Sequence, residues 1–137
     1  MRSLIFALTL MGIGGVAVGQ DTQTRNPGIE NTIEQQIEAF QVDDFAKAFE
    51  YASPTIQGLF GTSENFGAMV QNGYPMVWRP KDVRFGELRQ IEGNLWQQVI
   101  VIDQAGQVFA LDYMMVEVKG DWRIAAVQMI PPPEVAV

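Results

Sequence analysis

One segment concentrates the aromatic and cationic side chains that could contact a ligand: residues 73–80, with the sequence GYPMVWRP. Tyrosine and tryptophan combine an apolar body with one polar group, and arginine presents a planar fork that binds carboxylates. Two prolines stiffen the segment. These residue types predict that Tyr74, Trp78 and Arg79 contact a bound molecule. The alternative is a rigid connector whose aromatic rings fill the end of the core.

Asp112 is a second candidate for chemistry, because aspartate is disfavoured in β-strands and this one interrupts an apolar run. If its carboxyl group faced a pocket, burial would raise the pKa and Asp112 could act as a general acid or base. Tyr51 or Tyr74 would then supply a phenol, since Tyr113 points to the opposite face of the strand. The alternative is that Asp112 lies on the outer face, paired with Arg123 or another cation.

The chain contains no histidine and no cysteine. Their absence excludes Ser-His-Asp and Cys-His catalysis, and it removes the commonest ligand sets for zinc, copper and haem. The sequence also has no glycine-rich phosphate loop of standard spacing. We therefore expect no metal and no cofactor. A formal net charge of -7 argues against nucleic-acid binding, which depends on lysine and arginine at the phosphates.

Residues 1–19 have the pattern of an export signal. A positive start at Arg2 precedes an apolar run, and small residues stand just before Gln20. Cleavage before Gln20 would place the protein in the periplasm or outside the cell, with no membrane span left. The alternative is a retained membrane anchor, although the run is short for a bilayer span, which needs about 20 residues.

Residues 20–28 are polar and predict a flexible lead-in, and residues 29–137 predict one domain. Apolar residues then recur every three or four positions, which places them on one face of a helix. The residues of this stripe are Ile29, Ile33, Ile37 and Phe40. Further helical patterns, separated by capping residues, extend to residue 73, so residues 29–73 predict three or four short helices.

From residue 83 the apolar period changes to two. The pattern predicts four strands, at 83–92, 95–103, 107–118 and 122–130, joined by short turns as an antiparallel meander. Helices followed by strands predict an α+β fold with N-terminal helices on one face of a four-stranded sheet. The strand at 107–118 is apolar on both faces. Because helices can cover only one face, we expect the other to pack against a second copy in a homodimer.

Several short runs resemble a known family. The runs are Ile37-x-x-Phe40, residues 48–54 (AFEYASP), Phe60-Gly61, Met69-Val70, residues 73–75, Arg79-Pro80, Tyr113-Met114 and residues 122–124 (WRI). Together they resemble a bacterial envelope family, the domain of unknown function numbered 4864, over about the whole domain. The resemblance implies the cystatin-like, nuclear-transport-factor-two-like superfamily, in which helices pack into a strongly curved antiparallel sheet and form a cone with a pocket. That superfamily contains isomerases, dehydratases, ligand binders and dimerisation modules, so the fold does not decide the function.

Three functions remain open from the sequence. The first expectation is a non-catalytic module that binds a small apolar ligand or another protein, with Tyr74, Trp78 and Arg79 at the ligand. The second is a cofactor-free enzyme of the isomerase or dehydratase type that uses Asp112 to move a proton. The third is a purely structural envelope protein whose aromatic side chains only complete the core.

Overall fold

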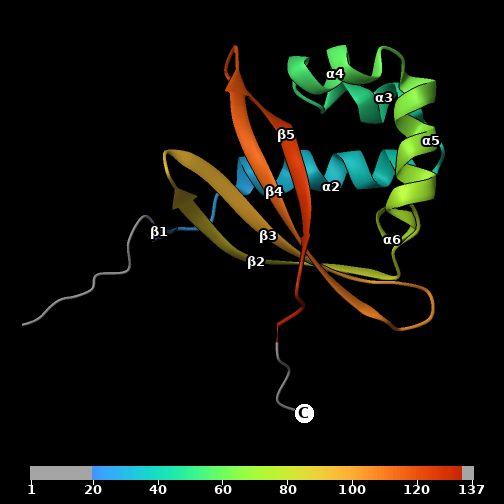
Figure 1. Ribbon diagram of the computed structural model, residues 1–137. Coiled ribbons are helices and arrows are strands. Elements are labelled where there is room, and N and C mark those ends of the chain that lie inside the picture. Colours follow the sequence, from blue (N-terminus) through green and yellow to red (C-terminus); the bar gives the residue numbers. More distant parts are fainter. Residues whose placement is uncertain (1–19, 134–137) are drawn as a thin grey trace, which may run out of the picture.

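The computed structural model describes residues 20–133 and has an α+β fold. Within this range the helices are α2 (Pro27–Gln41), α3 (Phe45–Glu50), α4 (Pro54–Phe60), α5 (Ser63–Gly73) and α6 (Pro75–Trp78). The strands are β1 (Gln20–Gln23), β2 (Asp82–Ile91), β3 (Asn94–Ile102), β4 (Val108–Val118) and β5 (Asp121–Ile130). They form one antiparallel sheet in the order β1-β2-β3-β4-β5. The helices α3 to α6 gather around the C-terminal half of α2 (Figure 1).

Helix α2 begins where its capping residue dictates. The side chain of Asn26 accepts hydrogen bonds from the backbone N–H groups of Gly28 and Ile29, at 3.0 and 3.2 Å. Pro27 occupies the first helical position, where its missing N–H costs nothing. The helix therefore starts two residues before the expected boundary. The predicted apolar stripe is confirmed, since all four of its residues are buried: Ile29, Ile33, Ile37 and Phe40.

The sheet has five strands within the described range, not the expected four. Residues Gln20–Gln23 pair antiparallel with β2, from Gln20 opposite Ile91 to Gln23 opposite Leu88. The prediction of a flexible lead-in at residues 20–28, based on their polar character, is therefore wrong for this segment. An edge strand needs only backbone hydrogen bonds to its one neighbour, so its sequence can be polar. The sheet is open, with β1 and β5 at its edges, and does not match exactly the cone that the resemblance implies.

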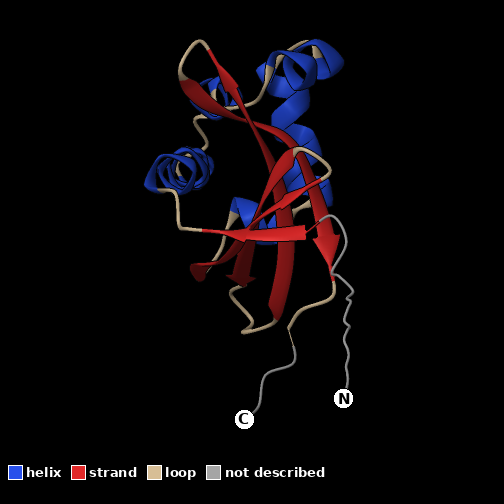
Figure 2. Ribbon diagram, turned by 90° about the vertical axis from the view of Figure 1, so that its left-hand side faces the viewer, coloured by secondary structure: helices blue, strands red, loops and turns tan. Residues whose placement is uncertain are grey.

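Tight turns and irregular pairings twist this sheet. The β2–β3 and β4–β5 hairpins turn on Glu92-Gly93 and Lys119-Gly120, all four with positive φ, the turn geometry that matches the twist of paired strands. A bulge in β2 places Gly86 and Glu87 opposite a single residue, Gln98. A Cβ atom on Gly86 would meet the amide oxygen of Gln98, so a larger residue here would force that side chain to move. Bulges increase local bending, and Figure 2 shows the bend of the long strands.

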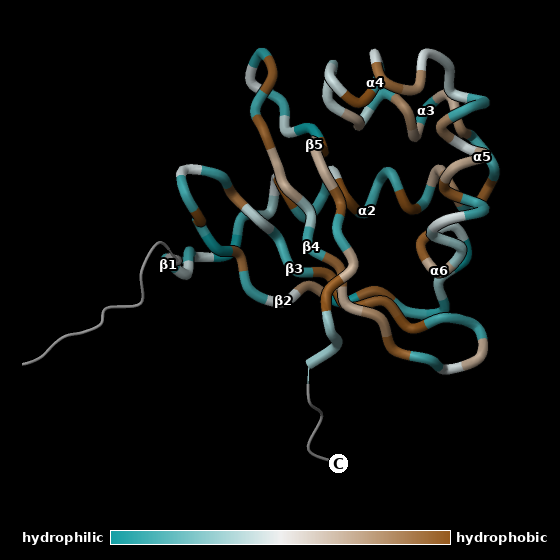
Figure 3. The backbone as a smooth tube through the Cα atoms, viewed as in Figure 1, coloured by the Kyte–Doolittle hydropathy of each residue, from teal (hydrophilic) through white to brown (hydrophobic). Residues whose placement is uncertain are grey.

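The core lies between the helices and the inner face of the sheet. Val99, Val101 and Leu111 are fully buried against the stripe of α2. In Figure 3 the central strands contain hydrophobic stretches, whereas the turns between strands are mostly hydrophilic. In the part of the chain that the structure describes, no helix is both long enough and apolar enough to span a membrane. The predicted export signal at 1–19 lies outside the described residues.

The first prediction tests this core. Ile33 has 0% exposure, so Ile33→Ala removes buried methyl groups and leaves a cavity. We expect the free energy of unfolding to fall by about 2–5 kcal/mol, measured by urea denaturation. Val42 is 75% exposed, and Val42→Ala is the control, with an expected change within about 0.5 kcal/mol. Equal losses in the two variants would contradict the assignment of α2 to the core.

Candidate functional site

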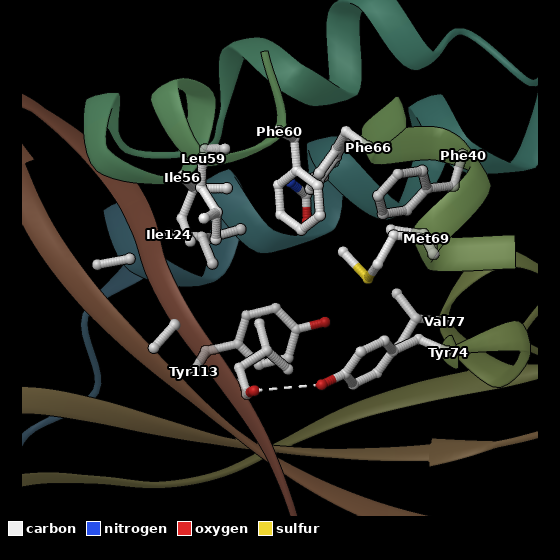
Figure 4. Close-up of a pocket in the computed structure, with 16 residues that line it drawn as sticks. Phe40, Ile56, Leu59, Phe60, Phe66, Met69, Tyr74, Val77, Tyr113 and Ile124 are labelled. Atoms are coloured by element: carbon white, nitrogen blue, oxygen red, sulfur yellow. Dashed lines mark hydrogen bonds between the residues drawn. The ribbon is translucent and has the colours of Figure 1, made fainter. Parts of the chain in front are cut away.

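A cavity of ≈ 320 Å³ lies between the helices and β5. Sixteen residues line it, and they come from α2, α4, α5, α6, β4, β5 and the connections between helices. Three phenylalanines form part of its wall, with the Phe66 ring 5.9 Å from that of Phe40 and 5.8 Å from that of Phe60. Leu59 lines the cavity while 73% exposed, so the rim lies at α4. Figure 4 shows Met69 directed toward the centre of the cavity.

The connection between α3 and α4 is bonded to the edge strand β5 at one side of this cavity. The N–H of Ser53 donates to the carbonyl of Ile124 at 2.8 Å, and the N–H of Ile124 donates to the carbonyl of Tyr51, also at 2.8 Å. Directly after Ile124, Ala125 is the extra residue of a bulge against β4. Ala125 and the small residue after it, Ala126, both line the cavity. The two hydrogen bonds therefore hold α4 at a set distance from β5, and the bulge leaves space between them.

Two tyrosines supply the hydroxyl groups of the cavity. Tyr113, in β4, is 1% exposed, and Figure 4 shows its hydroxyl directed into the cavity. Burial raises the pKa of Tyr113 well above its usual value, and the neighbouring Tyr74 raises it further. The hydroxyl of Tyr74 donates to the carbonyl of Val127 at 3.4 Å. Tyr113 therefore remains a neutral phenol at physiological pH.

The remaining polar side chain in the lining is an amide. Gln36, in α2, is buried, and its Nε2 donates to the carbonyl of Ala48 at 3.1 Å. None of the sixteen lining residues is charged. Among residues 20–133, no group of three or more acidic side chains is placed to hold a metal ion. The site offers neutral hydrogen-bonding groups within apolar walls.

Of the three residues predicted to contact a ligand, only Tyr74 lines the cavity. The Trp78 indole N–H donates to Asp43 Oδ1 at 2.9 Å, and the Arg79 guanidinium lies 4.1 Å from the Trp78 ring. Arg79 also donates to Asp43 at 3.0 Å and to the carbonyl of Phe40 at 2.7 Å. The hydrogen bonds from Trp78 and Arg79 lower the pKa of Asp43. These contacts attach α6 to the end of α2, as expected of a rigid connector.

Asp112 lies on the face of the sheet opposite the helices and does not line the cavity, where an acid or base role would require it. Both of its oxygens accept from Arg89, at 2.7 and 2.6 Å, and both side chains are buried. Burial raises the pKa of Asp112, and the guanidinium of Arg89 opposes that shift. This geometry agrees with the alternative given above, in which Asp112 lies on the outer face and pairs with a cation. The partner is Arg89, however, and Arg123 lies beside Asp121 at 3.8 Å.

The sequence was compared with models of known protein families, with curated proteins and with solved structures. The sequence model of a domain of unknown function, DUF4864, matches residues 22–137. The chain belongs to the DUF4864 family. No curated protein matches it. No solved structure matches it either.

Tyr113 is the site residue of this DUF4864 domain that sequence reasoning did not select. The alternation of strand side chains already placed Tyr113 opposite Asp112. A pocket role for Asp112 would therefore place Tyr113 on the face away from the pocket. The structure reverses the two positions: Tyr113 faces the helices and Asp112 faces away from them. The pairing of Asp112 with Arg89 explains why an aspartate occurs in this strand, and it leaves Tyr113 as the residue that faces the cavity.

The second prediction concerns the Arg89–Asp112 pair. Arg89→Met leaves a buried carboxylate without its partner, and we expect a loss of about 3–5 kcal/mol in the free energy of unfolding. The double variant Arg89→Met/Asp112→Leu removes both charges and should recover most of that loss. Urea denaturation at neutral pH measures both. An equal loss in the single and double variants would show that the two side chains are not energetically coupled.

Proposed function

We propose that this DUF4864 domain is a non-catalytic module that binds a small, uncharged and mostly apolar molecule between its helices and β5. The observation that carries the proposal is the cavity of ≈ 320 Å³, whose sixteen lining residues include no charged side chain. Ligand pockets usually occupy about 300–1,000 Å³ and are lined mainly by apolar and aromatic residues. The volume lies at the lower end of that range, which favours a small ligand.

The lining favours binding over catalysis. General acid–base catalysis needs a group whose pKa lies near the working pH. The titratable groups in the lining are Tyr74 and Tyr113, and the pKa of Tyr113 is raised further by burial. The carboxylate of Asp112 lies on the other face of the sheet in its pair with Arg89. These positions give no support to an isomerase or dehydratase that uses Asp112.

We also propose that the domain forms a homodimer through the outer face of the sheet. Trp96, Ile100 and Met114 alternate with core residues of β3 and β4, so they lie on the face away from the helices, and all three remain partly exposed. The Arg89–Asp112 pair on this face is neutral overall. Two copies of a chain with a net charge of -7 repel each other. A neutral, apolar face is therefore the surface through which they can associate at least cost.

Export to the periplasm or beyond the cell is part of the same proposal. It rests on the charge and hydropathy pattern of residues 1–19. Cleavage before Gln20 would leave β1 complete and paired with β2. The exported domain would then contain the helices, the five-stranded sheet and the cavity between them.

The third prediction tests the cavity with N-phenylnaphthylamine, an uncharged dye whose fluorescence rises in apolar surroundings. The protein should bind the dye, and Met69→Trp should weaken binding at least about tenfold because the larger side chain fills the space. Overpacking can also destabilise a fold, so the unfolding midpoint is measured in parallel. Met69→Ala, which enlarges the cavity, should retain binding.

Met129→Trp is the matched control, because Met129 is 49% exposed and does not line the cavity. This variant should bind the dye as the unmodified protein does. A failure of the unmodified protein to bind, or full binding by a folded Met69→Trp variant, would refute the proposed site.

The fourth prediction concerns the dimer. Native mass spectrometry at micromolar concentration should show two copies, and Ile100→Lys should give a monomer, because a lysine would be buried without a partner at the interface. Val42→Lys, at an exposed position of the connection after α2, should remain dimeric. A monomer of unmodified protein at that concentration would rule out the dimer. With protein from its own host, the same spectra test whether the chain begins at Gln20.

A further inference from the structure

Tyr113 is 1% exposed, and its hydroxyl makes no hydrogen bond to residues 20–133 but is accessible from the cavity, since Gln97 Oε1 is the one fully buried side-chain atom without a partner in that range. Its register position fixes the direction of the ring, since Tyr113 stands opposite Gln97 on β3 and Val127 on β5. Both its neighbours in β4 point to the outer face. Figure 4 shows the hydroxyl directed into the cavity. A ligand that fills the cavity displaces water from this hydroxyl, and a hydroxyl left without a partner is then costly. An acceptor atom on the ligand would remove that cost.

The surroundings of this hydroxyl limit which partner it can take. The other phenol, that of Tyr74, already donates to the carbonyl of Val127. The side chains of Met69, Phe60 and Val77 face the same space and are apolar. A ligand carboxylate would lose its hydration without meeting a cation, and an ammonium group would lose it without meeting a carboxylate. The cavity therefore offers a ligand apolar walls and one neutral hydrogen-bond donor, the Tyr113 hydroxyl.

We propose that the Tyr113 hydroxyl is a specificity-determining donor that selects uncharged ligands with a compact apolar body and one acceptor oxygen, such as a ketone or ester carbonyl. The inference rests on the proposed function, because it concerns the ligand of the same cavity. Burial keeps the phenol protonated, so it donates over the whole physiological pH range. Hydrocarbons of the same shape bind more weakly, because they leave the hydroxyl without a partner. Carboxylates of that shape are excluded.

The test uses three molecules that share one carbon skeleton: tetralin, alpha-tetralone and tetralin carboxylate. Each competes with N-phenylnaphthylamine for the cavity. With the unmodified protein, alpha-tetralone should bind about tenfold more tightly than tetralin, which is the effect of one additional buried hydrogen bond. Tetralin carboxylate should not compete. The preference for the ketone should be the same at about pH 7 and pH 9, below the titration of the phenol.

The decisive variant is Tyr113→Phe, which keeps the ring and removes only the hydroxyl. The affinity for alpha-tetralone should fall to that for tetralin, while the affinity for tetralin should stay unchanged. The unfolding midpoint without ligand should not fall, because the hydroxyl makes no hydrogen bond within the described chain. Tyr51→Phe is the matched control. Its hydroxyl donates to Gln35 outside the cavity, so both affinities should remain those of the unmodified protein.

The outcomes separate this inference from the proposed function. If the dye binds but tetralin and alpha-tetralone compete equally, the cavity binds ligands and the role of Tyr113 is refuted. A preference for the ketone that persists in Tyr113→Phe refutes it too, and assigns the hydrogen bond to another group. If the unmodified protein binds neither the dye nor any of the three molecules, the proposed function fails and this inference fails with it.

Discussion

The rest of the structure depends on the burial of the apolar stripe of α2 against the inner face of the sheet. Ile29 and Ile33 are completely buried there, together with Val99 and Leu111 of the central strands. The chain has no cysteine, so no disulfide supplements this contact. Apolar burial must therefore provide most of the favourable free energy of folding. It also sets where α2 lies. Helices α3 and α6 pack on α2, α5 packs on α3 and α6, and α4 packs on α5 and β5.

Burial alone would close the space between the layers, and local backbone features keep part of it open. The paired hydrogen bonds of Ile124 with Tyr51 and Ser53 attach the start of α4 to β5. The bulge at Ala125 then changes the direction of the strand, since a bulge adds bending and twist. At the other end, Asp43 connects to Trp78 and Arg79 and holds α6 against α2. The cavity lies between these two attachments.

The two faces of β4 carry polar groups that differ in their hydrogen bonding. On the outer face, Asp112 is fully engaged by Arg89, which satisfies both carboxylate oxygens. On the inner face, Tyr113 is buried and its hydroxyl faces the cavity. The first arrangement is typical of structural stability or of an interface, because a buried charge must be paired. The second is typical of a binding site, where a polar group is available to bond to a ligand. Adjacent residues in one strand thus serve different surfaces.

The sequence by itself determined the long helix, the four long strands and the apolar face of that helix. The stripe from Ile29 to Phe40 and the change of period at residue 83 located the long helix and four strands to within about two residues, because hydrophobic periodicity is a local property. It could not reveal β1, since an edge strand is held by backbone hydrogen bonds that leave no side-chain pattern. Only the tertiary structure decided the partners of the candidate residues. Arg89 lies 23 residues from Asp112, and Trp78 lies 35 residues from Asp43. Such pairings follow from the packing of whole elements, and so does the cavity that Tyr113 faces.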